Sequence, residues 1–336
     1  MTSSLEKPAG AGRWALRLGI GLFVTGAVIY FAAHEFNLHE AWATLARANL
    51  CYLALALAVM LANIGLKAWR WRWLYGTEPG CPSGARLLNA LMIGQLGNAL
   101  LPARLGDVAR IWAAGAGQAA GMGSALMTVL VEKAIDSFML LATLAALLPF
   151  IVLAPWLKRS QLVLSVGLVG LLAMLALLAA NAPLRGRLLA LLQRLPLGPA
   201  RPYLERTLQM VARLQGLRER KVQTRLWASS LAIWLTAGLI NQLGFLALHL
   251  SLPLAAGYLL AVTELTGNRV AYTPAGIGVY HYVCVLTLAL YGVSFEAALG
   301  AGILLHLVVY MPIVLGGLAA VWLESLDVRR LLALSP

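Results

Sequence analysis

The chain is a series of apolar runs separated by short polar segments. The first run, residues 18–33, follows three basic residues, and we interpret it as an uncleaved first helix. A transmembrane helix needs about 20 mostly apolar residues. The other runs of roughly suitable length cover residues 50–66, 125–153, 162–180, 227–250, 277–291 and 297–323.

Two shorter segments, residues 87–101 and 253–270, are interrupted by polar side chains. The first stops at Pro102 and is followed by Arg104 and Arg110, which stay on the cytoplasmic side only if this segment enters the membrane and returns as a re-entrant half-helix. The pattern predicts an all-α protein. We expect a polytopic transmembrane helix bundle with about seven or eight spans and one or two re-entrant half-helices.

The composition agrees with a membrane protein. Of 336 residues, 61% are hydrophobic and 12% are charged, whereas about 25% are charged in soluble domains. The net charge is +13, but basic residues are expected on cytoplasmic loops, so no nucleic-acid partner is implied. The three cysteines lack the spacing of a disulfide framework or a metal site. We expect no metal and no other cofactor.

Charge asymmetry predicts the orientation of the chain. Residues 181–226 carry ten Lys or Arg and two Glu, so this basic connector is expected in the cytoplasm, either as helices lying on anionic lipid or as a solvated link. It divides a single membrane domain, residues 1–336, into a first half (13–180) and a second half (227–323). We expect a multi-pass protein of the inner, cytoplasmic membrane.

The run at residues 50–66 ends in the sequence KAWRWRW. Lys67, Arg70 and Arg72 alternate there with tryptophans, a pattern typical of the cytoplasmic interface. The preceding polar segment, residues 34–49, holds two Glu and one Arg. The first hairpin is therefore expected to leave the cytoplasm and return, which places the N-terminus in the cytoplasm.

A broken-helix pattern occurs once in each half. The segments GNALLPARLGDVAR and GNRVAYTPAGIGVYH both hold Gly-Asn followed by Pro-Ala-x-x-Gly. Such breaks are tolerated at membrane depth where the freed backbone groups line a cavity or are buried in protein. Paired breaks in two halves indicate a transporter site and an internal inverted repeat. The predicted break residues are Pro102, Gly106, Pro274, Gly276 and Gly278.

Three ionisable residues interrupt the run at residues 125–153. Glu132 and Asp136 are four apart and share a helix face, and Lys133 can pair with Asp136. Charges at this depth are costly and face a cavity or each other. The group is expected either to line a polar cavity or to form a dry ion pair.

The residues after the first break are candidates for headgroup binding. Arg104 and Arg110 could hold a lipid phosphate at the end of a half-helix, with Asp107 and Asn98 beside them. The alternative is that both arginines only extend to the interface.

Candidates in the second half are polar residues in or near its apolar runs. The histidines could be proton carriers or hydrogen-bonded packing residues, and Asn241 and Gln242 are expected to form hydrogen bonds between helices. The cavity-lining candidates of this half are Glu264, Asn268, Arg269, His281 and His306.

These residues resemble the transmembrane region of lysylphosphatidylglycerol synthase and its stand-alone flippase-like relatives. The motifs NALLPARLGDVAR, VEKAID and TPAGIGVYHY carry the resemblance, which covers residues 13–323. Where the family usually has two adjacent glycines and a carboxylate, this chain has Ala275-Gly276 and His281, and His306 replaces a frequent late arginine. These departures indicate a subfamily with its own substrate. Without an aminoacyl-transferase domain in these residues, no lysine transfer is expected.

The resemblance implies a lipid transporter of the flippase type, moving an anionic or polyprenyl-linked lipid between leaflets through a polar cavity. Two alternatives stay open: a membrane transferase acting on a lipid-linked donor, and a non-transporting scaffold of a lipid-biosynthesis pathway. Motifs of metal, serine or zinc-protease chemistry are absent from the sequence, which favours a transporter over an enzyme. Expected partners are the lipid, an anionic lipid surface at the basic connector, and a lipid-pathway enzyme or a second copy of the chain.

Overall fold

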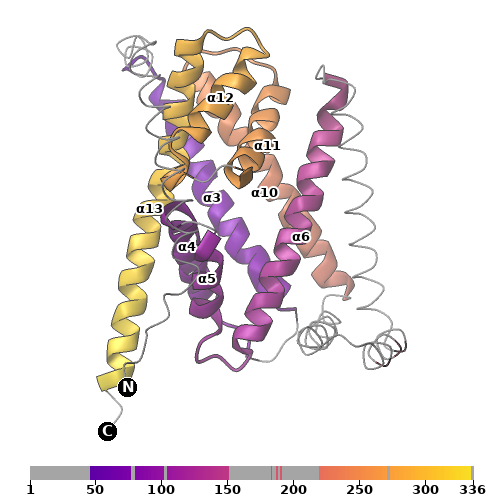
Figure 1. The fold of residues 1–336 in the computed structure, drawn as a ribbon, viewed down its shortest axis with the longest axis vertical. Helices are drawn as coiled ribbons and strands as arrows, with labels where there is room; N and C mark the ends of the chain where they lie inside the picture. Colours follow the sequence, from indigo (N-terminus) through magenta and orange to yellow (C-terminus); the bar gives the residue numbers. More distant parts are fainter. Residues whose placement is uncertain are drawn as a thin grey trace, which may run out of the picture. The chain divides into compact units, whose positions relative to one another are not determined.

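The computed structural model describes residues 46–76, 80–101, 104–150, 219–270 and 273–333, with three isolated positions between 183 and 190. Over these residues the chain forms eight α-helices and two short 3-10 helices, and no strand (Figure 1). The all-α helical bundle expected from the sequence is confirmed. The first apolar run, the run at 162–180 and nearly all of the basic connector lie outside the described residues, so the number of crossings stays a prediction.

The described helices follow the apolar runs with shifted ends. In the first half they are α3 (Leu50–Leu74), α4 (Gly84–Leu100), α5 (Leu105–Gly115), α6 (Gly121–Leu147) and η2 (Leu148–Phe150). In the second half they are α10 (Arg220–Ala247), α11 (Leu254–Val270), η5 (Pro274–Gly276), α12 (Val279–Ala289) and α13 (Phe295–Ala333).

Three of the described helices are long and apolar enough to cross a bilayer: α3, α10 and residues Phe295–Glu324 of α13. At about 1.5 Å per residue, each exceeds the hydrocarbon thickness of about 30 Å. Large apolar side chains such as Leu55, Leu235 and Leu318 are exposed along them. Such exposure is expected where lipid is the solvent. Helix α6 is also long, with 27 residues, but it carries Glu132, Lys133 and Asp136.

Helix order and helix length repeat between the two halves. Helices α4 and α11 each have 17 residues, and the helices after the breaks, α5 and α12, each have 11 residues. A five-residue link then connects α5 to α6 in the first half, and another connects α12 to α13 in the second. Glycine is the fourteenth residue of both α4 and α11, and an added Cβ at Gly97 or Gly267 would lie 2.7 Å from the helix after the break. The Gly-Asn motif therefore marks a repeated unit of structure, whose inverted orientation stays a prediction.

The chain divides into two compact units. Unit 1 comprises Met1–Leu61, Met92–Ala109 and Thr236–Pro336, and unit 2 comprises Ala62–Leu91 and Arg110–Leu235. Within unit 1, α12 packs against α11 and α13 (Figure 1). In the same unit α13 passes close to α4, since a Cβ at Gly317 would lie 2.5 Å from the Leu96 side chain.

Backbone geometry before α5 and α12 keeps either break from forming one continuous helix. Arg104 before α5 has φ 56°, and Ala275, Gly276 and Gly278 before α12 have φ 55°, 71° and 90°. These left-handed conformations end a right-handed helix. Pro102 lies outside the described residues.

Gly106 lies in the first turn of α5 and is buried. There it allows close packing on α4, because a Cβ would overlap the carbonyl of Gly94 and the amide of Asn98.

Candidate functional site

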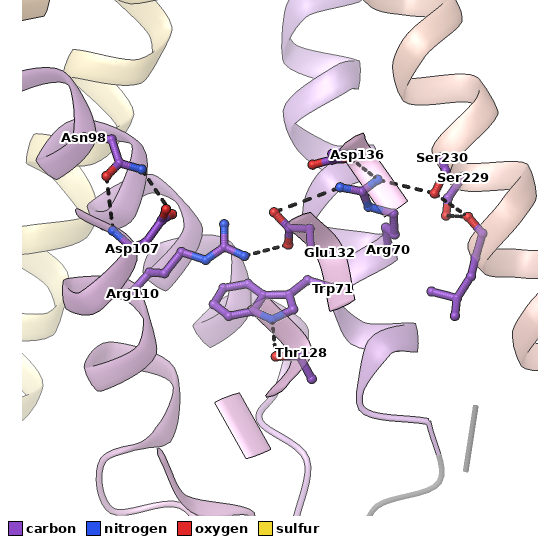
Figure 2. Close-up of polar contacts among 11 residues, drawn as sticks. Arg70, Trp71, Asn98, Asp107, Arg110, Thr128, Glu132, Asp136, Ser229 and Ser230 are labelled. Atoms are coloured by element: carbon purple, nitrogen blue, oxygen red, sulfur yellow. Dashed lines mark hydrogen bonds and ion pairs between the residues drawn. The ribbon is translucent and has the colours of Figure 1, made fainter. Parts of the chain in front are cut away.

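Two arginines and two carboxylates meet in unit 2 (Figure 2). Arg70 donates from Nη1 to Asp136 Oδ1 at 2.6 Å, and its Nη2 lies 4.0 Å from Glu132 Oε1. Arg110 donates from Nη2 to Glu132 Oε2 at 2.5 Å. The four residues of this ion network come from three helices: Arg70 from α3, Arg110 from α5, and Glu132 and Asp136 from α6.

The ion network is largely shielded from solvent. Side-chain exposure is 1% for Arg70, 4% for Arg110, 9% for Glu132 and 23% for Asp136. The two positive and two negative groups of the network cancel formally, which is how buried charges are normally accommodated. Lys67 and Lys133 also interact electrostatically with Glu132. Asp136 is the member with most access to the surroundings.

Helix spacing and neighbouring polar groups position Arg70. Glu132 and Asp136 are four residues apart on α6, so both carboxylates reach the same guanidinium. Arg70 also donates to Ser230 Oγ on α10 at 3.3 Å. About two helical turns before Arg70 on α3, Asn63 donates from Nδ2 to the Ile233 carbonyl at 2.9 Å. Within unit 2 these contacts fix α3 against α6 and α10.

Trp71 supports the other arginine. Its indole Nε1 donates to Thr128 Oγ1 at 2.8 Å, and the Arg110 guanidinium carbon lies 4.3 Å from the ring centroid. A cation over an indole face is attracted by the ring quadrupole. Trp71 is fully buried, so Arg110 is held between an aromatic face and the Glu132 carboxylate.

Each arginine keeps a donor that is not used. The Nε atoms of Arg70 and Arg110 are buried and have no hydrogen-bond partner within the described residues. A guanidinium carries five N–H donors, and leaving one unsatisfied in a buried place costs free energy. The ion network can therefore accept another anionic or polar oxygen.

The residues that sequence spacing grouped around the first break take part in two sets of contacts. In unit 1, Asn98 Nδ2 donates to Asp107 Oδ1 and the Asp107 amide donates to Asn98 Oδ1, both at 3.1 Å. Arg110 instead joins the ion network of unit 2. Arg104 and Lys133 are half-buried.

The second-half candidates belong to unit 1. Glu264 lies on α11, His281 on α12 and His306 on α13, and the two histidine rings stack with centroids 5.0 Å apart. Asn268 and Arg269 occupy the last turn of α11, and their side chains are not among those that the structure describes. Asn241 forms the hydrogen bond between helices expected of it, donating to the Gly257 carbonyl of α11 at 3.1 Å.

Two members of the site were misjudged from the sequence. The KAWRWRW pattern predicts an interfacial belt, yet α3 continues to Leu74, Arg70 is 1% exposed and Trp71 is 0% exposed. Trp69 and Arg72 are exposed, as the belt predicted. A signal was present in the spacing of Asn63, Lys67 and Arg70, which places three polar residues on one helix face.

None of the three cysteines belongs to the ion network. Cys51, Cys81 and Cys284 form no disulfide bond with one another. Among the residues that the structure describes, no group of three or more His, Cys, Asp or Glu side chains is arranged to hold a metal ion.

Comparison with known proteins gives one match. A family model described as the lysylphosphatidylglycerol synthase TM region matches residues 16–317, a range that contains the whole ion network. No curated protein and no solved structure matches the chain.

Proposed function

The chain belongs to the lysylphosphatidylglycerol synthase transmembrane-region family, a family of lipid-related membrane proteins, and from this premise we propose that it is a lipid transporter of the flippase type. It moves a lipid with an anionic headgroup, a phospholipid or a polyprenyl-linked lipid, between leaflets. The observation that carries the proposal is the buried ion network, whose two arginines each keep an unused Nε donor.

The cost of the ion network argues for a function beyond folding. A buried ion pair is often no better for stability than well-packed apolar side chains of similar volume. Ionisable groups within membrane segments usually mark substrate or ion pathways. Guanidinium groups suit phosphate because they donate two parallel hydrogen bonds, which an ammonium group does not reproduce.

The geometry around Arg110 supports an exchange of partners. A headgroup phosphate would take the free Nε donor first and then replace Glu132 on the same guanidinium. Trp71 keeps the guanidinium in place during the exchange, and the released Glu132 carboxylate remains beside Arg70, 4.0 Å away. Each charge then keeps a partner throughout, so the barrier from unpaired buried charge is avoided.

The remaining sequence-based assignments complete the proposal. Arg104 at the first break, with the hydrogen-bonded pair Asn98 and Asp107, is the candidate for first contact with the headgroup. Lys133 and the polar candidates of the second half are assigned to the polar cavity that the sequence predicts. The protein resides in the inner membrane with a cytoplasmic N-terminus, and its basic connector lies on anionic lipid.

Reconstituted vesicles test the proposal. Parent protein and Arg110→Lys are placed in liposomes containing phosphatidylglycerol with a fluorescent headgroup or chain label, and translocation is followed by bleaching of the outer leaflet with an impermeant reductant. Arg110→Lys keeps the charge but loses the forked donor geometry, so we expect translocation at least tenfold slower than the parent.

Arg225→Lys is the matched control. Its guanidinium carbon lies 4.1 Å from the Trp73 ring centroid, as Arg110 lies over Trp71, but no ion pair with a carboxylate is formed within the described residues. This variant should translocate lipid at the parent rate. Equal rates for Arg110→Lys and the parent would remove the assignment of Arg110 to the headgroup.

A further inference from the structure

The internal repeat places different chemistry at matching positions in the two halves. Glu132 is the twelfth residue of α6 and His306 is the twelfth residue of α13, while Arg110 and Cys284 are each the sixth residue of α5 and α12. The paired charges Arg110 and Glu132 of the first half are thus matched by a cysteine and a histidine in the second.

The matching positions in unit 1 belong to one aromatic cluster. The ring of His306 is stacked on His281 at 5.0 Å and on Tyr310 at 4.2 Å, and it meets the Tyr280 ring edge-on at 5.1 Å. Tyr280 is 2% exposed. Helices α12 and α13 therefore enclose three ionisable rings around His306.

Several polar atoms in this cluster have no partner. The Tyr280 hydroxyl, Glu264 Oε1 and His306 Nδ1 are buried without a hydrogen bond among the described residues. The carboxyl of Glu264 on α11 faces the Tyr280 hydroxyl, without the geometry of a hydrogen bond, and also interacts electrostatically with Cys284. A buried polar atom without a hydrogen bond is costly, so these three atoms on half-buried or buried side chains are candidates to bind a proton.

A backbone hydrogen bond fixes which ring nitrogen of neutral His281 carries the proton. Its Nδ1 accepts a hydrogen bond from the Gly278 amide at 3.3 Å, so in the neutral ring the proton is on Nε2. Nδ1 of His306 is buried and accepts no such hydrogen bond from the described residues. The ionisable groups beside the Glu264 carboxyl or the His306 ring are Tyr280, His281 and Cys284 from α12 and Tyr310 from α13.

We propose that Glu264, Tyr280 and His306 form a proton-binding site in unit 1, which takes up one proton from water. The proton adds to the Glu264 carboxylate and forms a carboxylic acid beside the Tyr280 hydroxyl. His306 Nδ1, on the ring that meets the Tyr280 ring edge-on, is the second candidate acceptor. Glu264 forms no ion pair with the side chains that the structure describes. Such a carboxylate is costly at membrane depth, and a proton removes that charge. The inference does not rest on lipid transport.

The carboxylates in the ion network of unit 2 differ from Glu264 because each has a cationic partner. Arginine does not release its proton in proteins, and both carboxylates there are paired with guanidiniums. Proton exchange is therefore assigned to the second half and anion contact to the first.

Infrared spectroscopy of the full chain in lipid nanodiscs tests the site directly. A carboxylic acid absorbs at a C=O frequency separate from carboxylate and amide bands, and the spectrum is followed from acidic to alkaline buffer. We expect an acid band at neutral pH in the parent, its loss in Glu264→Gln, and a frequency shift in Tyr280→Phe, which removes the hydroxyl beside the carboxyl. Glu296→Gln, in the first turn of α13, is the control and should keep the band.

Two results would overturn the site: no acid band in the parent at neutral pH, or a band unchanged in Glu264→Gln. If Glu264→Gln does not fold, the Tyr280→Phe spectrum decides, because an unshifted band would show that the acid is elsewhere. None of these outcomes depends on whether the protein moves lipid.

Discussion

Removal of Arg70 should destabilise the protein more than removal of Arg70 together with its partner Asp136. Arg70→Met deletes the 2.6 Å bond to Asp136 and the 3.3 Å bond to Ser230. The remaining network holds two carboxylates and one guanidinium. Because Arg70 is only 1% exposed, water does not readily replace it, and a broken buried pair costs about 3–5 kcal/mol.

Partial exposure places the expected cost at the lower end of that range. The Asp136 side chain is 23% exposed, so its carboxylate recovers some solvation, and we expect about 3 kcal/mol for Arg70→Met. At 1.4 kcal/mol for each factor of ten, this is a change of about a hundredfold in the unfolding equilibrium. Adding Asp136→Asn restores neutrality, so the double variant should regain about 1.5 kcal/mol or more.

The assay is unfolding in mixed micelles, followed by circular dichroism, for the parent, both single variants and the double variant. Arg225→Met is the control, since Arg225 lies over Trp73 without an ion pair in the described residues, and it should cost about 0.5–1 kcal/mol. If Arg70→Met costs no more than this control and the two substitutions are additive, Arg70 and Asp136 form a solvated pair and the reasoning fails.

Three further predictions concern packing, a buried hydrogen bond and orientation. Gly106→Ala should lower the melting temperature because its Cβ overlaps the backbone of α4, whereas Gly65→Ala, with nothing within 4 Å, should leave it unchanged or raise it. Trp71→Phe loses the 2.8 Å bond to Thr128 and should cost about 1 kcal/mol in the same unfolding assay. A single cysteine in residues 181–226, in a chain without native cysteines, should resist an impermeant reagent in intact cells, and labelling without permeabilisation would reverse the orientation.

Much of the helical order follows from the sequence because apolar length and helix breakers are local signals. The Gly-Asn motif predicted paired elements, and α4 and α11 indeed have 17 residues each before their breaks. The four-residue spacing of Glu132 and Asp136 predicted a common face, and both carboxylates approach Arg70.

The partners of these carboxylates could not be read from the same pattern. Arg70 and Trp71 alternate with exposed residues in KAWRWRW, so composition favoured an interface. Whether such residues are buried depends on which neighbouring helix covers that turn of α3, which is a tertiary property. Likewise Arg110 is three residues from Asp107, but helix packing within unit 2 pairs it with Glu132 instead.

Transport by a charge-balanced variant tests the central claim most directly. Arg110→Gln/Glu132→Gln removes one positive and one negative group that pair at 2.5 Å, so the protein should remain folded and monodisperse. If the ion network handles the headgroup, vesicles with this variant should translocate labelled phosphatidylglycerol no faster than protein-free vesicles, while the parent translocates it rapidly. Parent-like translocation by the folded double variant would contradict the account and leave the Arg110 and Glu132 pair with a structural role alone.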